Sequence, residues 1–80
     1  MLNRYDIQYH INSDKQNEST ITVYAHTVKK AFEFAAKRII STKRVRTINF
    51  ERYTAYDKNN NIISEAPSNR SIRYTVGGKQ

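Results

Sequence analysis

Residues 27–42 read TVKKAFEFAAKRIIST, and this stretch has the clearest hydrophobic period in the chain. Its apolar residues recur with the spacing of one helical face: Val28, Ala31, Phe32, Ala35, Ala36, Ile39 and Ile40. Thr27 is a good N-cap, because its hydroxyl can accept a hydrogen bond from an orphan backbone N–H of the first turn. The stretch predicts an amphipathic helix whose apolar stripe covers a core.

The opposite side of this helix is unusual. It places Phe34 among cations, with Lys30 and Lys37 one turn away on either side and Arg38 flanking them. An aromatic ring turned away from the expected core is either covered by another part of the protein or used on a partner. The first alternative is the more ordinary one, because single exposed apolar residues are common.

Strands are predicted on both sides of the helix. Residues 4–12 and 19–26 each alternate apolar and polar side chains, and the polar segment 13–18 between them predicts an antiparallel hairpin. Residues 44–57 predict a long third strand. Its apolar phase changes after Phe50, which a bulge near Arg52, twist or an edge position would each explain.

The last third of the chain predicts a hairpin and a short extension. Residues 57–61 read DKNNN, which favours a turn because Asn and Asp tolerate the left-handed region. A return strand begins at Ile62, and residues 72–76 alternate again. Residues 77–80 are expected to be a tail.

These elements predict an α+β fold in the order β-β-α-β-β, with one helix on one face of a mainly antiparallel sheet of four or five strands. A right-handed crossover through the helix and an inserted first strand give the order 2-1-3-4, a split β-α-β arrangement. Residues 1–76 form the expected single domain. The other sheet face is expected to be open and polar, and to include His10, Tyr24 and Tyr53.

Composition points to one small domain. The chain has 80 residues, of which 38% are hydrophobic, below the ~45–50% of typical soluble domains. A homodimer would add buried surface, so self-association is an expectation. The absence of cysteine excludes disulfides and fits a reducing cytoplasm. No apolar run is long enough to span a membrane, and no N-terminal apolar signal segment is present.

Positive charge is concentrated in the middle of the chain. The net charge is +7, and residues 29–52 contain eight of the 14 basic residues but two of the seven acidic ones. Such clustering favours polyanions, nucleic acid first and then acidic proteins. A basic surface that merely improves solubility is the simpler alternative.

The charge pattern gives a set of candidate binding residues for DNA or RNA. Lysines and arginines of the helix and third strand would contact phosphates, while an aromatic ring would stack on bases or pack on a partner. Tyr24 is a further stacking candidate. The set comprises Lys30, Phe34, Lys37, Arg38, Lys43, Arg44, Arg46, Arg52 and Tyr53.

Nothing in the sequence indicates an enzyme or a cofactor. The only glycines are Gly77 and Gly78, so no phosphate-binding glycine loop is present. His10, His26 and Asp6 could hold zinc if they met on one sheet face. Two outward polar histidines that never meet are the better interpretation, so no metal site is predicted.

A protein partner is the alternative function. Small cysteine-free single domains are typical of phage and mobile-element accessory proteins, including anti-defence inhibitors such as anti-CRISPR proteins. A protein of this type would place its basic face on an acidic patch, or in a nucleic-acid site, of a host protein. Phe34 would then be a hot spot of the interface.

Residues 21–51 read ITVYAHTVKKAFEFAAKRIISTKRVRTINFE, the order strand, helix, basic turn and strand. This order locally resembles the archaeal ribosomal protein LX family, and the resemblance implies binding to ribosomal RNA. It extends over less than half of the chain, and the Asn-rich hairpin and the tail differ from that family.

Overall fold

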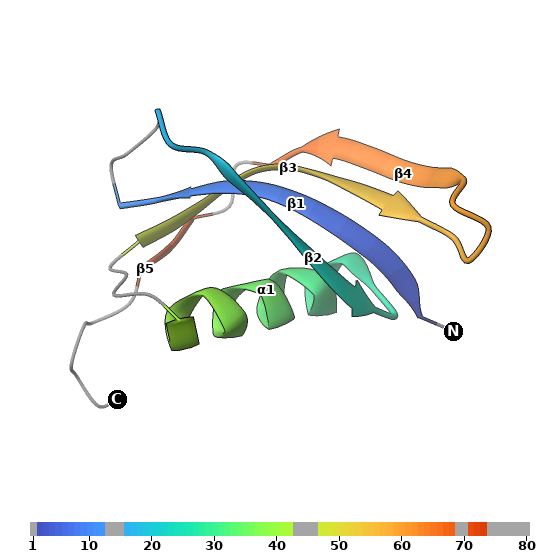
Figure 1. Cartoon of the computed structure of the whole chain (residues 1–80), viewed down its shortest axis with the longest axis horizontal. Helices are drawn as coiled ribbons and strands as arrows, with labels where there is room; N and C mark the ends of the chain where they lie inside the picture. Colours follow the sequence, from blue (N-terminus) through green and yellow to red (C-terminus); the bar gives the residue numbers. More distant parts are fainter. Residues whose placement is uncertain (1, 13–15, 43–46, 69–70, 74–80) are drawn as a thin grey trace.

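The computed structural model describes residues 2–12, 16–42, 47–68 and 71–73. Within them the chain forms strands β1 (Asn3–Ile11) and β2 (Ser19–Ala25), helix α1 (Val28–Thr42), and strands β3 (Thr47–Tyr56), β4 (Ile62–Pro67) and β5 (Ser71–Arg73). The helix lies on one face of the sheet (Figure 1). The predicted α+β class and the β-β-α-β-β order are confirmed. Lys43, Arg44, Arg46 and the predicted tail, residues 77–80, lie outside the described residues.

The sheet has the predicted order β2-β1-β3-β4. β1 pairs antiparallel with β2 on one side and with β3 on the other. β4 pairs with the end of β3, and β5 pairs with its beginning, from Thr47 to Asn49. Because β1 occupies one side of β3 over most of its length, β4 and β5 share the other side. The predicted final strand is therefore present over residues 71–73, and the rest of it lies outside the described residues.

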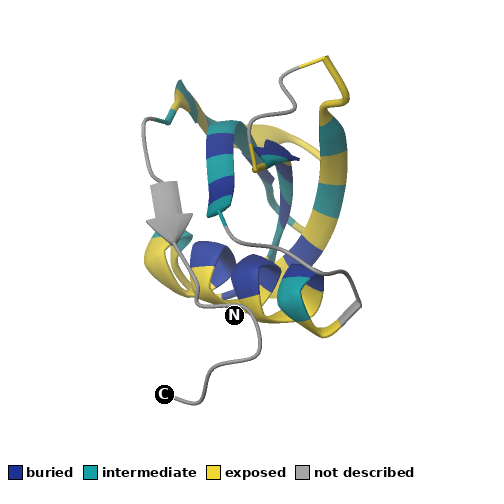
Figure 2. Ribbon diagram, turned by 90° about the vertical axis from the view of Figure 1, so that its left-hand side faces the viewer, coloured by how far each residue is buried: buried dark blue, intermediate teal, exposed yellow. Residues whose placement is uncertain are grey.

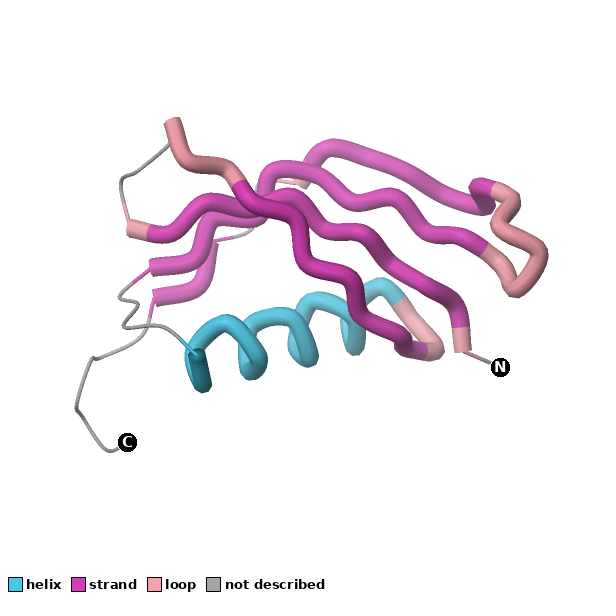
Figure 3. The backbone as a smooth tube through the Cα atoms, in the orientation of Figure 1, coloured by secondary structure: helices cyan, strands magenta, loops and turns pink. Residues whose placement is uncertain are grey.

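Helix α1 is capped and buried as its sequence predicts. The backbone N–H of Lys30 donates to Thr27 Oγ1 at 3.1 Å, and that of Ala31 donates to the Thr27 carbonyl at 3.0 Å. The predicted stripe is buried in the core, with Val28 and Ile40 at its margins. Figure 2 shows buried and exposed stripes alternating along the helix, and Figure 3 shows its axis running below the strands.

The centre of the core is a cluster of aromatic rings. Phe32 of α1 lies 4.8 Å from Phe50 and 5.9 Å from Tyr53, both in β3, between ring centroids. Tyr53 also lies 6.3 Å from Tyr5 of β1. Its hydroxyl hydrogen-bonds with Ser64 Oγ at 2.8 Å. The prediction that Tyr53 faces outward is therefore wrong, because this side chain packs between the sheet and the helix.

A bulge in β3 explains that error. Gln8 of β1 pairs with Arg52, whereas the next residue, Tyr9, pairs with Phe50, so Glu51 is one residue too many in β3. An extra residue reverses the alternation of side chains along the rest of the strand. Phe50 before the bulge and Tyr53 after it consequently face the same core. A bulge near Arg52 was one of the three predicted explanations for the change of phase, and it is present.

The turn between β3 and β4 is organised by Asp57. Its Oδ1 accepts hydrogen bonds from the backbone N–H groups of Asn59 at 2.8 Å and Asn61 at 2.9 Å. Asn60 has a left-handed φ of 67°, which asparagine tolerates better than most residues. The predicted turn at residues 57–61 is confirmed.

The first testable prediction concerns this turn. Hydrogen bonds, first that from the Asn61 N–H and then that from Asn59, hold the pKa of the Asp57 carboxyl below its ordinary value of 3.8. Because folding favours the carboxylate, its contribution to stability is present above pH 3.8 and is lost as the pH falls through the lowered pKa. We expect Asp57→Asn to flatten the acid limb of the stability curve, measured by urea unfolding between about pH 5 and pH 2. A carboxyl NMR titration that gives Asp57 an ordinary or raised pKa would contradict this.

The second prediction concerns the cap of α1. Thr27→Ala removes the oxygen that accepts from Lys30 N–H and is expected to lower the free energy of unfolding by about 1 kcal/mol. Thr27→Ser keeps that oxygen and should preserve most of the stability. Equal losses in the two variants would show that packing of the threonine methyl, and not the cap, is responsible.

The third prediction tests the facing of the tyrosines. Tyr53→Ala opens a hole between Phe32 and Tyr5 and is expected to cost about 2–4 kcal/mol. Tyr24→Ala, at a surface position, should cost less than about 0.5 kcal/mol. Chemical unfolding of both variants measures the difference. A similarly small loss of unfolding free energy in each variant would contradict the placement of Tyr53 against the core.

Candidate functional site

The exposed side of α1 brings four of the predicted residues together. Lys30, Phe34 and Lys37 follow one another at helical spacing, and Arg38 lies beside Lys37. All four are exposed, and Phe34 has 42% of its surface open to solvent. We call these four residues the helix face. No described segment of the chain buries the Phe34 ring, so it is available to a partner.

Positive charge dominates the helix face. Lys30 Nζ lies 3.5 Å from Glu33 Oε1, but both side chains are exposed, so this ion pair contributes little stability. Glu33 is the only acidic residue of α1, against four basic ones: Lys29, Lys30, Lys37 and Arg38. Within the described part of the chain, Lys37 has no acidic group within ion-pair distance. The helix therefore presents a surplus of cations on one surface.

The other candidates do not join this surface. Arg52 pairs across the sheet with Gln8 and with Pro67, on the face turned away from α1, and its Nη2 lies 3.9 Å from Glu65 Oε1. Tyr53 is partly buried and packs against the core. Lys43, Arg44 and Arg46 were predicted to extend the patch and lie outside the described residues. The structure thus reduces the patch that it can describe to the helix face.

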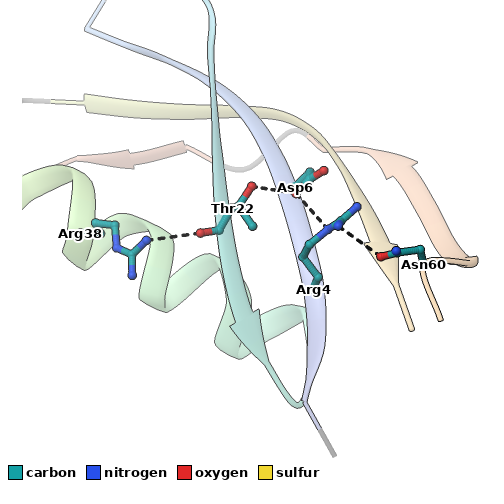
Figure 4. A network of polar contacts seen from close by, with 5 residues as sticks. All are labelled: Arg4, Asp6, Thr22, Arg38 and Asn60. Atoms are coloured by element: carbon teal, nitrogen blue, oxygen red, sulfur yellow. Dashed lines mark hydrogen bonds and ion pairs between the residues drawn. The ribbon is translucent and has the colours of Figure 1, made fainter. Parts of the chain in front are cut away.

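We call the sheet face turned away from α1 the outer face. A polar network starts on α1, passes the edge of the sheet at β2 and continues on this face (Figure 4). Arg38 Nη1 donates to the backbone carbonyl of Thr22 at 3.3 Å, and Thr22 Oγ1 donates to Asp6 Oδ1 at 2.9 Å. Asp6 in turn lies 3.6 Å from Arg4 Nε, and Arg4 Nη1 donates to Asn60 Oδ1 at 3.3 Å. The network leads from the helix across β2 and β1 to the turn after β3.

Arg4 also stacks on an aromatic ring that sequence reasoning did not select. Its guanidinium carbon lies 4.0 Å from the centroid of the Tyr56 ring, a cation–π contact. Tyr56 faces outward because it follows Tyr53 by three residues, beyond the bulge at Glu51. The signal was present in the changed phase of β3, but only the register with β1 shows which tyrosine faces which way.

His10 was expected on the open polar face and is instead buried, with 5% of its surface exposed. Its Nδ1 lies 2.5 Å from Glu51 Oε2, although the two groups are not aligned as a hydrogen bond. The bulge brings the Glu51 carboxylate to this position. The prediction that His10 is open to solvent is wrong. His10 lies between Tyr9 and Ile11, which face the core, so it is on the side away from α1, but Glu51 lies against it and the side chain is buried.

Within the described residues, no group of three or more histidine, cysteine, aspartate or glutamate side chains is placed to hold a metal ion. Over the same residues, no helix combines the length and apolar character needed to cross a bilayer.

Comparisons with protein-family models, with curated proteins and with solved structures gave no match to this chain. The local resemblance of residues 21–51 to the ribosomal protein LX family thus gains no support from a family model.

Proposed function

We propose that this protein is a small, non-enzymatic nucleic-acid-binding accessory protein that contacts phosphates through the helix face. The observation that supports the proposal most is the surplus of exposed cations on α1, which has one acidic residue against four basic ones. Exposed lysines on a rigid helix can approach several phosphates at once, and each contact releases counterions from the nucleic acid.

Two features of the chain add to this support. The net charge of +7 attracts a polyanion from a distance. Lys43, Arg44 and Arg46 follow α1 directly in the sequence and add three further cations to the same part of the chain. Arg52 is not included in the proposed phosphate-binding surface, because it lies on the other face of the sheet.

A second candidate function is supported by Phe34. An aromatic ring with 42% of its surface exposed, surrounded by Lys30, Lys37 and Arg38, has the composition of an interface hot spot. A phage or mobile-element protein could use it to bind and inhibit a host protein with an acidic or nucleic-acid-binding site. This alternative predicts a complex of fixed stoichiometry that Phe34→Ala abolishes while the fold remains intact.

The fourth prediction tests phosphate binding by salt titration. Labelled single-stranded and duplex oligonucleotides of DNA and RNA are titrated with protein between about 20 and 200 mM salt, and log Kd is plotted against log salt concentration. We expect Lys30→Gln/Lys37→Gln to reduce the magnitude of the slope by about 1.4–1.8, because each of the two lost phosphate contacts removes ~0.7–0.9.

A charge-matched control removes two cations elsewhere. Arg52→Gln/Lys58→Gln lowers the net charge equally but changes the outer face and the turn after β3. This control should leave the slope nearly unchanged. The proposal is contradicted if the protein binds no oligonucleotide at the lowest salt concentration. It is also contradicted if the two double variants have equal slopes.

A further inference from the structure

Three side chains form a row across the outer face. Tyr24 of β2 is paired with Arg4 of β1, and Arg4 is paired on its other side with Tyr56 of β3. Their neighbours in sequence, Tyr5, Val23 and Ala55, are buried in the core, so the row points away from α1. We call Tyr24, Arg4 and Tyr56 the aromatic row. Adjacent strands are ~4.8 Å apart, so its two tyrosines stand about 10 Å from each other.

The planar groups of this row are held ready for stacking. The Arg4 guanidinium lies 4.0 Å above the Tyr56 ring and is fixed at its other edge by Asp6 and Asn60. Tyr24 beside it has 59% of its surface exposed. Both aromatic rings and arginine guanidinium planes stack on unpaired bases. Because Arg4 is already restrained, binding would cost little additional side-chain entropy.

The polar groups around the row suit base edges better than phosphates. Thr22, Gln8 and Thr54 offer hydroxyl and amide groups on the same face. The charges there are mixed, with Arg4 next to Asp6 and Arg52 next to Glu65. Because these charges balance, the outer face has no surplus of positive charge to attract phosphates. The phosphates of a bound chain must therefore contact another surface of the protein.

The helix face supplies that charge and is connected to the row. Arg38 reaches from α1 to the carbonyl of Thr22 on β2, which is an edge strand of the sheet. The Thr22 hydroxyl lies on the outer face, where it donates to Asp6 beside Arg4. Figure 4 shows this continuous path around the edge of the sheet. A chain with its phosphates on α1 can therefore turn over β2 and lay its bases on the row.

Addition of a strand to either edge of the sheet is less favourable than use of this face. On β2, Arg38 occupies the carbonyl of Thr22. On β4, Ile63 is an extra residue opposite the step from Ala55 to Tyr56, and Pro67 at the end of the strand has no N–H. Irregularity, proline and covering side chains all disfavour edge pairing.

From this arrangement we infer that the aromatic row binds unpaired bases, so that the nucleic acid recognised by this protein is single-stranded. The inference rests on the proposed function, because the helix face supplies the attraction for phosphate. Bases in a duplex are stacked on each other and cannot reach a ring on a protein sheet. The protein therefore discriminates against duplexes by stacking, not by charge.

The experiment compares Tyr24→Ala with Tyr24→Phe, which keeps a stacking ring. Binding of a 12-nucleotide single strand and of its duplex is measured by fluorescence anisotropy, with DNA and RNA probes. Stacking of one base is worth ~1–3 kcal/mol, so Tyr24→Ala should weaken single-strand binding about 5- to 150-fold. Tyr24→Phe should remain within about twofold of the parent. Duplex affinity and the salt slope should not change in either variant.

A second variant tests the arginine. Arg4→Lys keeps the charge but removes the planar group above Tyr56, and we expect it to weaken single-strand binding several-fold without altering the slope. Thermal melts of all variants check that each remains folded. The chain has no tryptophan, so quenching of tyrosine emission by the single strand, reduced in Tyr24→Phe, gives an independent readout.

The outcomes separate the two levels of inference. If the parent protein binds no oligonucleotide at low salt, the proposed function fails, and the present inference fails with it. If it binds with a slope that depends on Lys30 and Lys37, but Tyr24→Ala has no effect on single strands, only the base-stacking inference is overturned. If Tyr24→Ala instead converts a dimer to a monomer, or releases a protein partner, without changing single-strand affinity, the row is a protein interface and the inference is likewise overturned.

Discussion

Glu51 is inserted into β3 between two residues that pair with consecutive positions of β1. Without this insertion, strict alternation after Phe50 would turn Arg52 and Thr54 towards α1 and Tyr53 and Ala55 towards solvent. With it, Tyr53 completes the ring cluster around Phe32, and Tyr56 becomes available to Arg4 on the other side. The same residue places its carboxylate against buried His10 and accepts a backbone hydrogen bond from Ser68 at 2.8 Å, where β4 ends. One extra residue thus determines the contents of both faces of the sheet.

The two layers of the protein consequently have different chemistry. The helix layer exposes lysine and arginine around Phe34, with a net excess of cations. The outer face of the sheet has nearly balanced charge and carries planar and hydrogen-bonding groups. In the proposed binding mode, long-ranged, salt-dependent electrostatic attraction comes from the helix layer, and short-ranged stacking comes from the outer face. Arg38 takes part in both layers, because its guanidinium extends from the helix to the edge of the sheet.

The fold was predictable because its main signals are local. The period of residues 28–40, the hydroxyl of Thr27 and the alternation in β1 and β2 each identify an element without knowledge of its neighbours. The order 2-1-3-4 follows from a right-handed crossover through the helix with the first strand inserted between the strands that it joins. The content of the outer face was only partly predictable. Whether Tyr53 or Tyr56 faces solvent, and whether His10 is covered, depends on where β3 gains its extra residue relative to β1, which is a property of two paired strands. The proposed patch was similarly divided, because residues close in the sequence, such as Arg38 and Arg52, belong to different layers.

The contact between Arg38 and the carbonyl of Thr22 has a consequence for the behaviour of the protein in concentrated solution. An exposed strand edge is a template for lateral growth of sheets, and a cation placed on it both occupies an acceptor and repels an identical molecule approaching from that side. An anion that drew Arg38 away would weaken this protection at the edge formed by β2. In the proposed binding mode, the Arg38 guanidinium couples polyanion binding to protection of the β2 edge, which is greatest while Arg38 stays on the Thr22 carbonyl.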